Sequence, residues 1–387
     1  YTQMKTTPPP IRVAATDGTQ IELADGRRLI DGVSSWWTAC HGYNHPHIRA
    51  AVQRQLDVMP HVMFGGLVHE PAETLARRLA DMLPGGRTRV FFSDSGSVSV
   101  EIAMKMALQY FINRGERDRR KFIAFEGAYH GDTIGAMSVC DPEEGMHSLF
   151  SGLLAEQHVI PLPRTDPEFA AFDSFLEHHA GECAAIIMEP LVQGAGGMKF
   201  HSAEALAAIR KRAQDHGLLF NLAEIITGFG RTGSMFACEQ AKVVPDIMTL
   251  AKALTGGTMA LAATVATDRV FDAFLSDDPG AALMHGPTYM ANPLACAAAN
   301  ASLDLFETEP RLTQVAAIET HLEAALEPCR GLPGVVDVRV KGAIGVVQVA
   351  DLKANEWLKS RFVEEGVWIR PSGGIVYLMP PFIIGDA

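Results

Sequence analysis

Lys252 is the residue of this chain whose surroundings best suit covalent chemistry. It follows the apolar segment Ile247–Ala251 and shortly precedes a turn that contains Gly256 and Gly257. Burial lowers the pKa of a lysine and frees its amine to attack an aldehyde. Pyridoxal phosphate (PLP) is an aldehyde cofactor that proteins hold through such an amine. The segment therefore predicts covalent attachment of PLP to Lys252.

A second segment has the features of a phosphate site. Asp94–Glu101 follows a short predicted strand, Arg89–Phe92, and opens a predicted helix. The backbone N–H groups of a helix start, the small residue Gly96 and the hydroxyl of Ser97 could together surround a phosphate. An ordinary N-cap is the alternative interpretation. The position of the segment in an α/β unit upstream of Lys252 favours the phosphate.

Aromatic residues stand in two polar surroundings. Tyr129, within Gly127–Thr133, could stack on a flat heterocycle, although a polar turn with a half-buried tyrosine is the alternative. The neighbours Trp36 and Trp37 cannot both point to one face of a strand, so at least one should line a cleft or an interface. The alternative is that one lies in the core and the other in a dimer contact.

Two arginines and one loop could recognise a substrate. Arg231 and Arg370 stand among apolar or glycine residues, and arginines placed in this way usually have a buried carboxylate partner. That carboxylate could belong to the protein or to a substrate. The loop His285–Pro293 could deliver the hydroxyl of Thr288 to a ligand or to a neighbouring subunit.

No pattern of ligands predicts a metal site. His41, His45 and His47 lie close together in the sequence, but no ligand-spaced carboxylate or paired thiols accompany them. The six cysteines are scattered without Cys-x-x-Cys spacing, which indicates reduced thiols rather than disulfides. Together with the absence of a signal peptide pattern, this predicts a cytoplasmic protein.

Composition excludes two classes of partner. The chain has 387 residues, 48% of them hydrophobic, and a formal net charge of -12. Its longest basic run is Arg119-Arg120-Lys121, whereas binding to nucleic acid requires an extended basic face. No apolar run approaches the roughly 20 residues that a membrane-spanning helix needs. We therefore expect an enzyme that binds neither nucleic acid nor a membrane.

From about His47 to Leu305, short apolar runs alternate with amphipathic helices, which predicts an α/β doubly wound, mostly parallel sheet. The clearest unit comprises a strand at Ala184–Met188, a helix at Ala203–His216 between Ser202 and Gly217, and a strand at Leu218–Leu222. Active groups of such sheets lie at the carboxyl ends of the strands. Glu189, Ala223 and Lys252 are expected to meet there.

The remaining residues predict a smaller α+β module. It would contain strands at Val335–Val340 and Ala343–Val349, a helix at Lys353–Glu365 and a hairpin of Val367–Arg370 with Ile375–Met379. The N-terminal residues, with a strand at Arg28–Ile30, are expected to join this module. We therefore predict a large domain at 48–305 and a small domain formed by 1–47 and 306–387.

Taken together, these segments resemble the class III, fold type I, PLP-dependent aminotransferases. The resemblance covers nearly the whole chain and rests on the segments 34–44, 63–66, 129–133, 189–197, 252–257, 285–293 and 366–381. It is strongest for the branch of this family that acts in biotin biosynthesis. That branch implies a ping-pong reaction in which S-adenosylmethionine gives its amino group to PLP, and 8-amino-7-oxononanoate then takes it up to form 7,8-diaminononanoate.

The resemblance also implies roles for individual residues. Lys252 would hold PLP and move a proton between substrate and cofactor, and Tyr129 would stack on the ring. Gly96 and Ser97 would bind the phosphate, helped by Gly286 and by Thr288 from the partner subunit of a homodimer whose sites are shared. Arg370 would bind the carboxylate of 8-amino-7-oxononanoate. The other residues implied to line the substrate site are Tyr1, Trp36, Trp37, Asp132, Arg231 and Tyr377.

The chain departs from the resemblance at one chemically important position. The ring nitrogen of PLP needs an anion that keeps it protonated, and the resemblance places an aspartate at residue 223, where this chain has Ala223. Glu224 cannot substitute, because neighbouring residues of a strand point to opposite faces. Asn221 shares the face of Ala223 but lies about 7 Å further back along the strand.

We therefore expect an aminotransferase with impaired proton transfer. A scaffold that binds PLP without turnover, or binds no PLP, is one alternative. Another alternative is an ω-aminotransferase with a different amine donor. The Trp36-Trp37 pair and the segment around Arg370 argue against it, because both resemble the biotin branch more closely.

Overall fold

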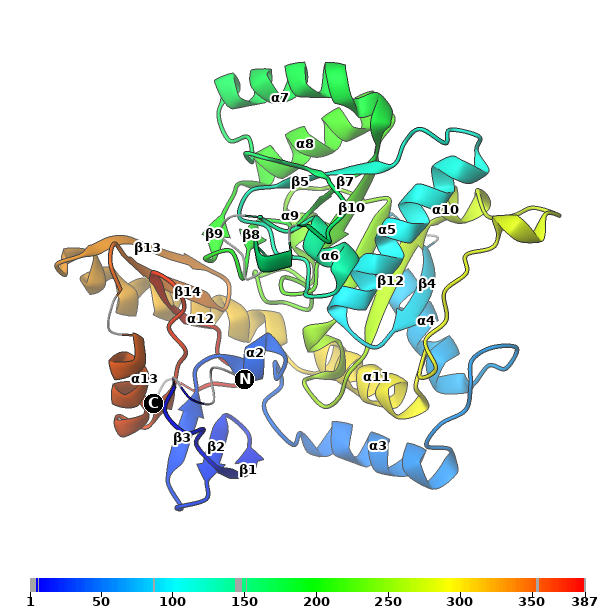
Figure 1. Ribbon diagram of the computed structural model, residues 1–387. Coiled ribbons are helices and arrows are strands. Elements are labelled where there is room, and N and C mark those ends of the chain that lie inside the picture. Colours follow the sequence, from blue (N-terminus) through cyan, green and yellow to red (C-terminus); the bar gives the residue numbers. More distant parts are fainter. Residues whose placement is uncertain are drawn as a thin grey trace.

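A computed structural model describes residues 5, 7–85, 88–142, 148–150, 152–352 and 355–385 of the chain (Figure 1). Its largest element is a seven-stranded sheet with the order β4-β12-β11-β10-β7-β5-β6. The strands are β4 Thr88–Ser93, β5 Lys121–Phe125, β6 His158–Ile160, β7 Cys183–Met188, β10 Leu219–Ala223, β11 Ile247–Leu250 and β12 Ala262–Thr267. All neighbours are parallel except β12, which is antiparallel to β11 and β4. The predicted, mostly parallel sheet is confirmed.

Helices cover both faces of this sheet (Figure 1). The helices of this part are α3 Pro46–Val58, α4 Glu70–Met82, α5 Gly96–Asn113, α6 Ile134–Ser138, α7 Asp166–His179, α8 Ala203–Asp215, α9 Ala237–Gln240, α10 Asp268–Asp272 and α11 Pro293–Thr308. Side chains of α5 pack with Leu219 and Ile247 on one face. Side chains of α7 and α8 pack with Phe220 and Leu222 on the other. The two apolar clusters make the sheet doubly wound, as predicted.

The predicted unit β7-α8-β10 is present nearly residue for residue. Ser202 caps α8 by accepting a hydrogen bond from the backbone N–H of Ala205 at 3.1 Å. Gly217 follows the helix with a φ of +69°, a conformation that glycine adopts without steric cost. The strands on either side are buried along their whole length, which explains their continuous apolar sequences.

The smaller part of the molecule contains two further sheets (Figure 1). One has the order β1-β2-β3-β15 and the other β13-β14-β16. Their elements are β1 Val13–Asp17, β2 Gln20–Leu23, β3 Arg28–Asp31, β13 Val335–Lys341, β14 Ile344–Val349, β15 Val367–Trp368 and β16 Ile375–Leu378, with helices α12 Arg311–Leu326 and α13 Asn355–Glu364. The remaining short elements are α2 Ser34–Trp37, β8 Val192–Gln193, β9 Lys199–Phe200, η1 Ser148–Phe150, η2 Ala180–Glu182, η3 Lys252–Thr255, η4 Pro279–Ala281 and η5 Glu327–Gly331.

The prediction of a hairpin between Val367–Arg370 and Ile375–Met379 is wrong. Strand β15 pairs in parallel with β3, and β16 pairs in antiparallel with β14, so the two strands belong to different sheets. The pairing of β15 is supported by a hydrogen bond from the N–H of Ile30 to the carbonyl of Gly366 at 2.8 Å. Each strand therefore pairs with an edge strand from a distant part of the chain rather than with its neighbour across the turn.

The same pairing joins the two ends of the chain. Because β3 and β15 share a sheet, the expected association of the N-terminal strand with the C-terminal module is confirmed. The domain boundaries stay a prediction, and residues 48 and 305 lie within α3 and α11. Among the described residues, no helix has the length and apolar character that a membrane span requires.

Candidate active site

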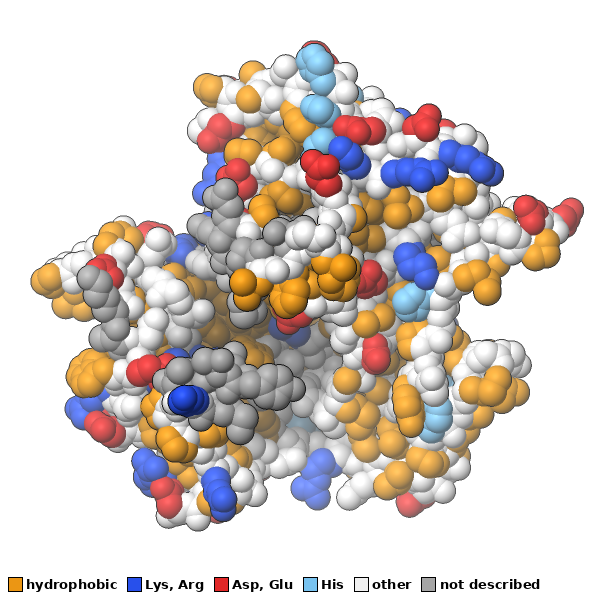
Figure 2. All heavy atoms as spheres, in the orientation of Figure 1, with side chains coloured by type: hydrophobic (Ala, Val, Ile, Leu, Met, Phe, Trp, Pro, Cys, Tyr) orange, Lys and Arg blue, Asp and Glu red, His pale blue; other side chains and the backbone are white. Residues whose placement is uncertain are grey.

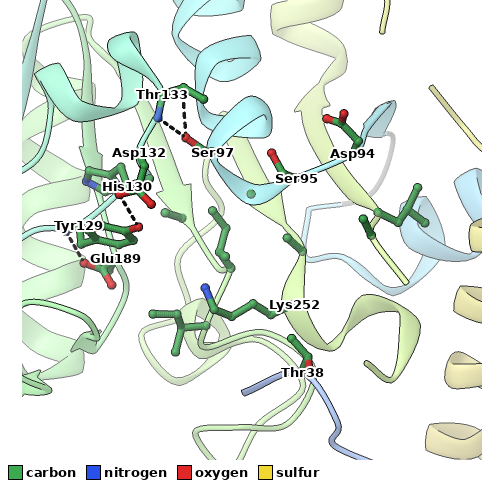
Figure 3. Close-up of a pocket in the computed structure, with 18 of the residues that line it drawn as sticks. Thr38, Asp94, Ser95, Ser97, Tyr129, His130, Asp132, Thr133, Glu189 and Lys252 are labelled. Atoms are coloured by element: carbon green, nitrogen blue, oxygen red, sulfur yellow. Dashed lines mark hydrogen bonds between the residues drawn. The ribbon is translucent and has the colours of Figure 1, made fainter. Parts of the chain in front are cut away.

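A cavity of about 480 Å³ opens at the carboxyl ends of β7, β10 and β11. Figure 2 shows the surface hollowed near the middle of the molecule, between its larger and smaller parts. Glu189 directly follows β7, Ala223 ends β10 and Lys252 begins η3 just after β11, and all three line the cavity. Figure 3 shows Glu189 and Lys252 in its wall. The prediction that these three residues meet is confirmed.

Lys252 presents its amine to this cavity from a strained backbone position. Its φ is +22°, which side chains other than glycine seldom adopt, and such strain is typical of functional sites. Burial lowers the pKa of Lys252 to about 8, although the charges of Glu189 and Asp132 act in the opposite direction. The Nζ atom lies 5.1 Å from the centre of the Trp37 ring. A much larger fraction of this amine than of an ordinary lysine is therefore unprotonated and nucleophilic near neutral pH.

Tyr129 and two carboxylates form the wall toward which Lys252 points (Figure 3). The hydroxyl of Tyr129 donates to Oδ1 of Asp132 at 2.9 Å, and its backbone N–H donates to Oε1 of Glu189 at 3.0 Å. The second oxygen of Glu189 accepts from the N–H of Gly194 at 2.8 Å. Burial raises the pKa of Glu189 to about 7, while these two N–H groups and Lys252 lower it. The carboxyl group is thus held in one orientation.

The N-terminus of α5 forms an adjoining side of the cavity, where Ser95 caps the helix by accepting from the N–H of Val98 at 3.3 Å. The Oγ of Ser97 lies 2.8 Å from Oγ1 of Thr133 and accepts from the N–H of Thr133 at 3.0 Å. Only glycine fits at position 131, because its φ is +128° and a Cβ there would lie 2.2 Å from the Ser97 Oγ. The loop after β5 is therefore packed directly against the helix start.

These residues fit PLP at three of its four recognition points. The amine of Lys252 suits its aldehyde, the helix start at Gly96 and Ser97 suits its phosphate, and the ring of Tyr129 suits its flat heterocycle. A Cβ at Gly96 would approach two atoms of Ile225 to 3.1 Å, so the small residue keeps this end of the cavity open. The fourth point, an anion for the ring nitrogen, has no acidic side chain at Ala223.

Glu224 points away from the cavity, as its position on the strand predicts. Its carboxylate accepts from the N–H of Cys238 at 2.8 Å and from the N–H of Ala237 at 3.1 Å, and so caps α9. The hydroxyl of Thr227 is a further donor to it. Burial raises the pKa of Glu224, whereas these donors lower it. Because this carboxylate is hydrogen-bonded to α9 and Thr227, it cannot replace an aspartate at 223.

Four of the predicted substrate residues form two contacting pairs, and one of them, Trp37, lies next to Lys252. Trp37 is buried, and its ring centre lies 6.0 Å from that of Tyr377 in an edge-on arrangement. Trp36 is 60% exposed, and the guanidinium of Arg370 lies 4.7 Å from its ring centre. Arg370 therefore has one face covered by an aromatic ring, which leaves its planar donors for an anion. None of these four side chains is among the residues that line the cavity itself.

The tryptophans face different ways because their backbone turns left-handed. Ser34, Ser35, Trp36 and Trp37 all have φ between +48° and +73°. Buried Asp31 stabilises this turn, since its carboxylate accepts from the N–H of Ser35 at 2.7 Å. The sequence reasoning treated the pair as part of a strand, and the structure corrects this to α2, a short left-handed turn.

Arg231 is buried and only 2% exposed. Its guanidinium donates to the carbonyls of Pro380 at 2.7 Å and Ala343 at 3.2 Å, and it lies 4.6 Å from the ring centre of Phe382. Burial lowers its pKa to about 10. Main-chain carbonyls thus take the place of the expected protein carboxylate among the described residues. These contacts join distant segments, and substrate binding by Arg231 stays a prediction.

Two predicted phosphate-binding residues lie on the surface, and one predicted substrate residue cannot be placed. Gly286 and Thr288 are exposed and do not line the cavity of their own chain. Their loop is anchored to α5 by Lys105, whose Nζ donates to the carbonyl of Met284 at 2.7 Å. Tyr1 is outside the described residues.

His130 is a cavity residue to which the sequence reasoning gave no role. It lines the wall beside Tyr129, and neither ring nitrogen has a hydrogen-bond partner within the described part of the chain. Burial lowers the pKa of His130 to about 4, so the imidazole is neutral. The sequence could have indicated this role, because His130 lies in the loop that follows the carboxyl end of a predicted strand, where active groups of such sheets gather.

A second cluster of polar side chains lies at the amino ends of β6 and β7, at the edge of the sheet away from the cavity. His158 Nε2 and His179 Nδ1 lie 2.9 and 3.0 Å from Oε1 of Glu182. Lys121 Nζ lies 3.5 Å from the other oxygen of Glu182, so a positive charge accompanies the carboxylate. Hydrogen bonds within the group account for its arrangement. Its residues come from β6, α7 and η2, a convergence that ligand spacing does not reveal.

The sequence matches the family described as "Aminotransferase class-III" over residues 1–387. A protein of Corynebacterium glutamicum named adenosylmethionine-8-amino-7-oxononanoate aminotransferase is 48% identical over 376 residues, covering 96% of this chain and 89% of that protein. A protein of the same name from Mycobacterium leprae is 48% identical over 98% of this chain and 88% of its own length.

Solved structures show the same architecture. The adenosylmethionine-8-amino-7-oxononanoate aminotransferase of Methanocaldococcus jannaschii superimposes with a TM-score of 0.93 and 33% identity, over 98% of this chain and 90% of that one. An amine transaminase from an uncultivated Pseudomonas species, solved in its PLP-bound form, has a TM-score of 0.89 and 34% identity, over 97% and 91% of the two chains. These matches confirm the predicted fold class.

Proposed function

Because the chain belongs to the class III aminotransferases, we propose that it moves the amino group of S-adenosylmethionine to 8-amino-7-oxononanoate and so forms 7,8-diaminononanoate. The observation that carries this proposal is that the buried Lys252 and the N-terminus of α5 line one cavity. The near full-length relatives named for this reaction support the choice of substrates.

We propose PLP as the cofactor, because the residues of the cavity fit three of its groups. When bound, PLP would supply an aldehyde that accepts an amino group and a ring that withdraws electrons. Lys252 would hold it covalently, and the released amine, with its lowered pKa, would take and return the proton at the substrate carbon. Gly96 and Ser97 would bind the phosphate through the N–H groups that begin α5.

The side chains around Lys252 would orient the reactants. Tyr129 is held by its hydrogen bond to Asp132, so its ring can lie flat against a heterocycle. Arg370, with one face on Trp36, would bind the carboxylate of 8-amino-7-oxononanoate. Trp37 and Tyr377 would cover the amine and keep bulk water from it.

We propose a homodimer with shared active sites. The exposure of Gly286 and Thr288 supports it, because residues that serve a phosphate only from a partner need not line their own cavity. Apolar side chains exposed on the same chain, Met63, Leu67 and Tyr289, would be covered by such a partner. We also propose a cytoplasmic location, because the six cysteines are free thiols, as is usual in a reducing compartment.

An ω-aminotransferase with another amine donor is the second candidate. An amine transaminase matches the fold nearly as well as the biotin-pathway enzyme does, with a TM-score of 0.89 against 0.93, so the fold does not distinguish the donors. An inactive PLP-binding scaffold is the third candidate, because Ala223 leaves the ring nitrogen without an anion. The three candidates differ in which amine donor, if any, gives a product.

The deciding experiment incubates the protein with PLP, 8-amino-7-oxononanoate and one amine donor at a time. With S-adenosylmethionine, mass spectrometry should detect 7,8-diaminononanoate. Product from alanine or a simple primary amine, and none from S-adenosylmethionine, would support the ω-aminotransferase. PLP binding without conversion of either donor at high protein concentration would support the inactive scaffold.

The lowered pKa of Lys252 predicts the pH dependence of cofactor attachment. A pKa of about 8 instead of 10.5 leaves about one tenth of the amine neutral at pH 7 rather than less than a thousandth. The rate of covalent PLP binding, followed by absorbance in stopped flow, should rise with pH and level off above about pH 8. In Glu189→Gln the midpoint should fall, since the charge of Glu189 raises this pKa. A midpoint near 10 would contradict the assignment.

A further inference from the structure

Two buried polar side chains next to the cavity lack partners. Asn221 on β10 and Thr249 on β11 are each 2% exposed. Nδ2 and Oδ1 of Asn221 and Oγ1 of Thr249 have no hydrogen-bond partner within the described part of the chain. Buried polar atoms are rarely left without a partner, and an ordered water commonly provides it.

The strand register places both side chains on the face of Ala223. Ala223 lies directly opposite Thr249 in the parallel pairing of β10 with β11, and Asn221 precedes Ala223 by two residues. Leu219 and Ile247, on the same face, pack against α5. Leu222 and Met248 point to the opposite cluster. The three polar atoms therefore lie between the sheet and α5, beside the residue that lines the cavity where an aspartate is expected.

We propose that Asn221 and Thr249 bind a water molecule beside Ala223, and that this water donates a hydrogen bond to the ring nitrogen of bound PLP. The inference rests on the proposed function, because it needs PLP in the cavity. A water suits the site, since it can pair with either the donor or the acceptor of Asn221 and with the hydroxyl of Thr249. Water can accept from Nδ2 of Asn221 and still donate on its other side.

The consequence concerns the protonation of the ring. A carboxylate keeps the ring nitrogen protonated, whereas a neutral water donates a hydrogen bond and leaves the nitrogen without a charge. The site would therefore bind PLP in its neutral-ring form. Asn221 and Thr249 are positioning residues in this arrangement, because they act on the cofactor only through the water.

A double-mutant cycle on PLP affinity tests the proposal. Asn221→Leu and Thr249→Val are each made in the parent protein and in Ala223→Asp, and PLP dissociation constants are measured by absorbance titration. In the parent, each substitution should weaken PLP binding about fivefold, the factor of one net hydrogen bond. In Ala223→Asp, where a carboxylate displaces the water, each should change the constant less than twofold.

Thr264→Val is the matched control. Thr264 pairs with Thr249 on the neighbouring strand, but its hydroxyl donates to the carbonyl of Ser99 at 2.9 Å. This variant should leave PLP affinity unchanged in both backgrounds. An effect as large as that of Thr249→Val would indicate a general disturbance of the packing under α5 and would overturn the proposal.

Two other results of the cycle would also decide whether the water site exists. Equal effects in both backgrounds, or no effect in the parent, overturn the water site while PLP binding still supports the proposed function. If Asn221→Leu does not fold, Thr249→Val provides the same comparison. Failure of the parent protein to bind PLP would remove the proposed function, and the water site with it.

Discussion

A protein with Lys252 replaced by arginine should lose covalent PLP attachment completely and transfer amino groups at least about 10²- to 10⁴-fold more slowly. Arginine keeps the positive charge beside Trp37, but its guanidinium stays protonated and cannot attack an aldehyde. The substitution also removes the base that would move the substrate proton. Both losses come from one amine, so the effect should be the largest of any single substitution in the cavity.

Reduction with borohydride followed by peptide mass spectrometry measures this directly. In the parent protein, the reduced cofactor should be found on the peptide that contains Lys252 and should be missing in Lys252→Arg. Lys211→Arg is the control, because Lys211 is exposed and pairs with Asp215 on the surface of α8. Cofactor on another lysine, or undiminished turnover in Lys252→Arg, would refute the role assigned to Lys252.

Replacing Ala223 with aspartate should raise the rate of amino transfer by roughly 10- to 10³-fold. Loss of one member of a buried ion pair costs about 3 to 5 kcal/mol. If half to all of this difference falls on the deprotonation step, a rate change of this size follows at about 1.4 kcal/mol per decade. Ala223 lines the cavity at the end of β10, so a carboxylate there can reach a bound cofactor.

Ala223→Asn separates charge from size in this test. Asparagine fills the same volume but cannot neutralise a protonated ring, so it should give little of the gain. Without PLP, Ala223→Asp should melt at a lower temperature than the parent, because its buried carboxyl group then has no cationic partner. Steady-state rates and melting curves with and without PLP check both statements. Equal rates for the two variants would show that charge at position 223 does not limit the reaction.

The arrangement of the central residues follows from local patterns in the sequence. Continuous apolar runs define β7, β10 and β11, and Ser202 and Gly217 mark the ends of α8. Parallel strands bring their carboxyl ends to one edge, so Glu189, Ala223 and Lys252 had to meet. The direction of Glu224 also follows, because alternation along a strand is a local property.

Other features depend on contacts between distant segments. Strand β15 pairs with β3 rather than with β16, and no local pattern reveals which distant edge is free. The left-handed turn at Ser34–Trp37 is stabilised by Asp31, which accepts from the N–H of Ser35, and this turn directs Trp36 outward and Trp37 inward. Arg231 finds carbonyls from two remote segments in place of a carboxylate.

The sequence alone determined the class of fold, the position of Lys252 after a buried strand and the helix start at Gly96 and Ser97, since these depend on residue type, periodicity and helix caps. The absence of an acid at Ala223 is implied by the resemblance to the class III aminotransferases. The tertiary structure decided the lowered pKa of Lys252, the stacking of Arg370 on Trp36 and the isolation of Asn221 and Thr249. Burial and hydrogen-bond partners are properties of packed neighbours. Those neighbours come from parts of the chain that only folding brings together.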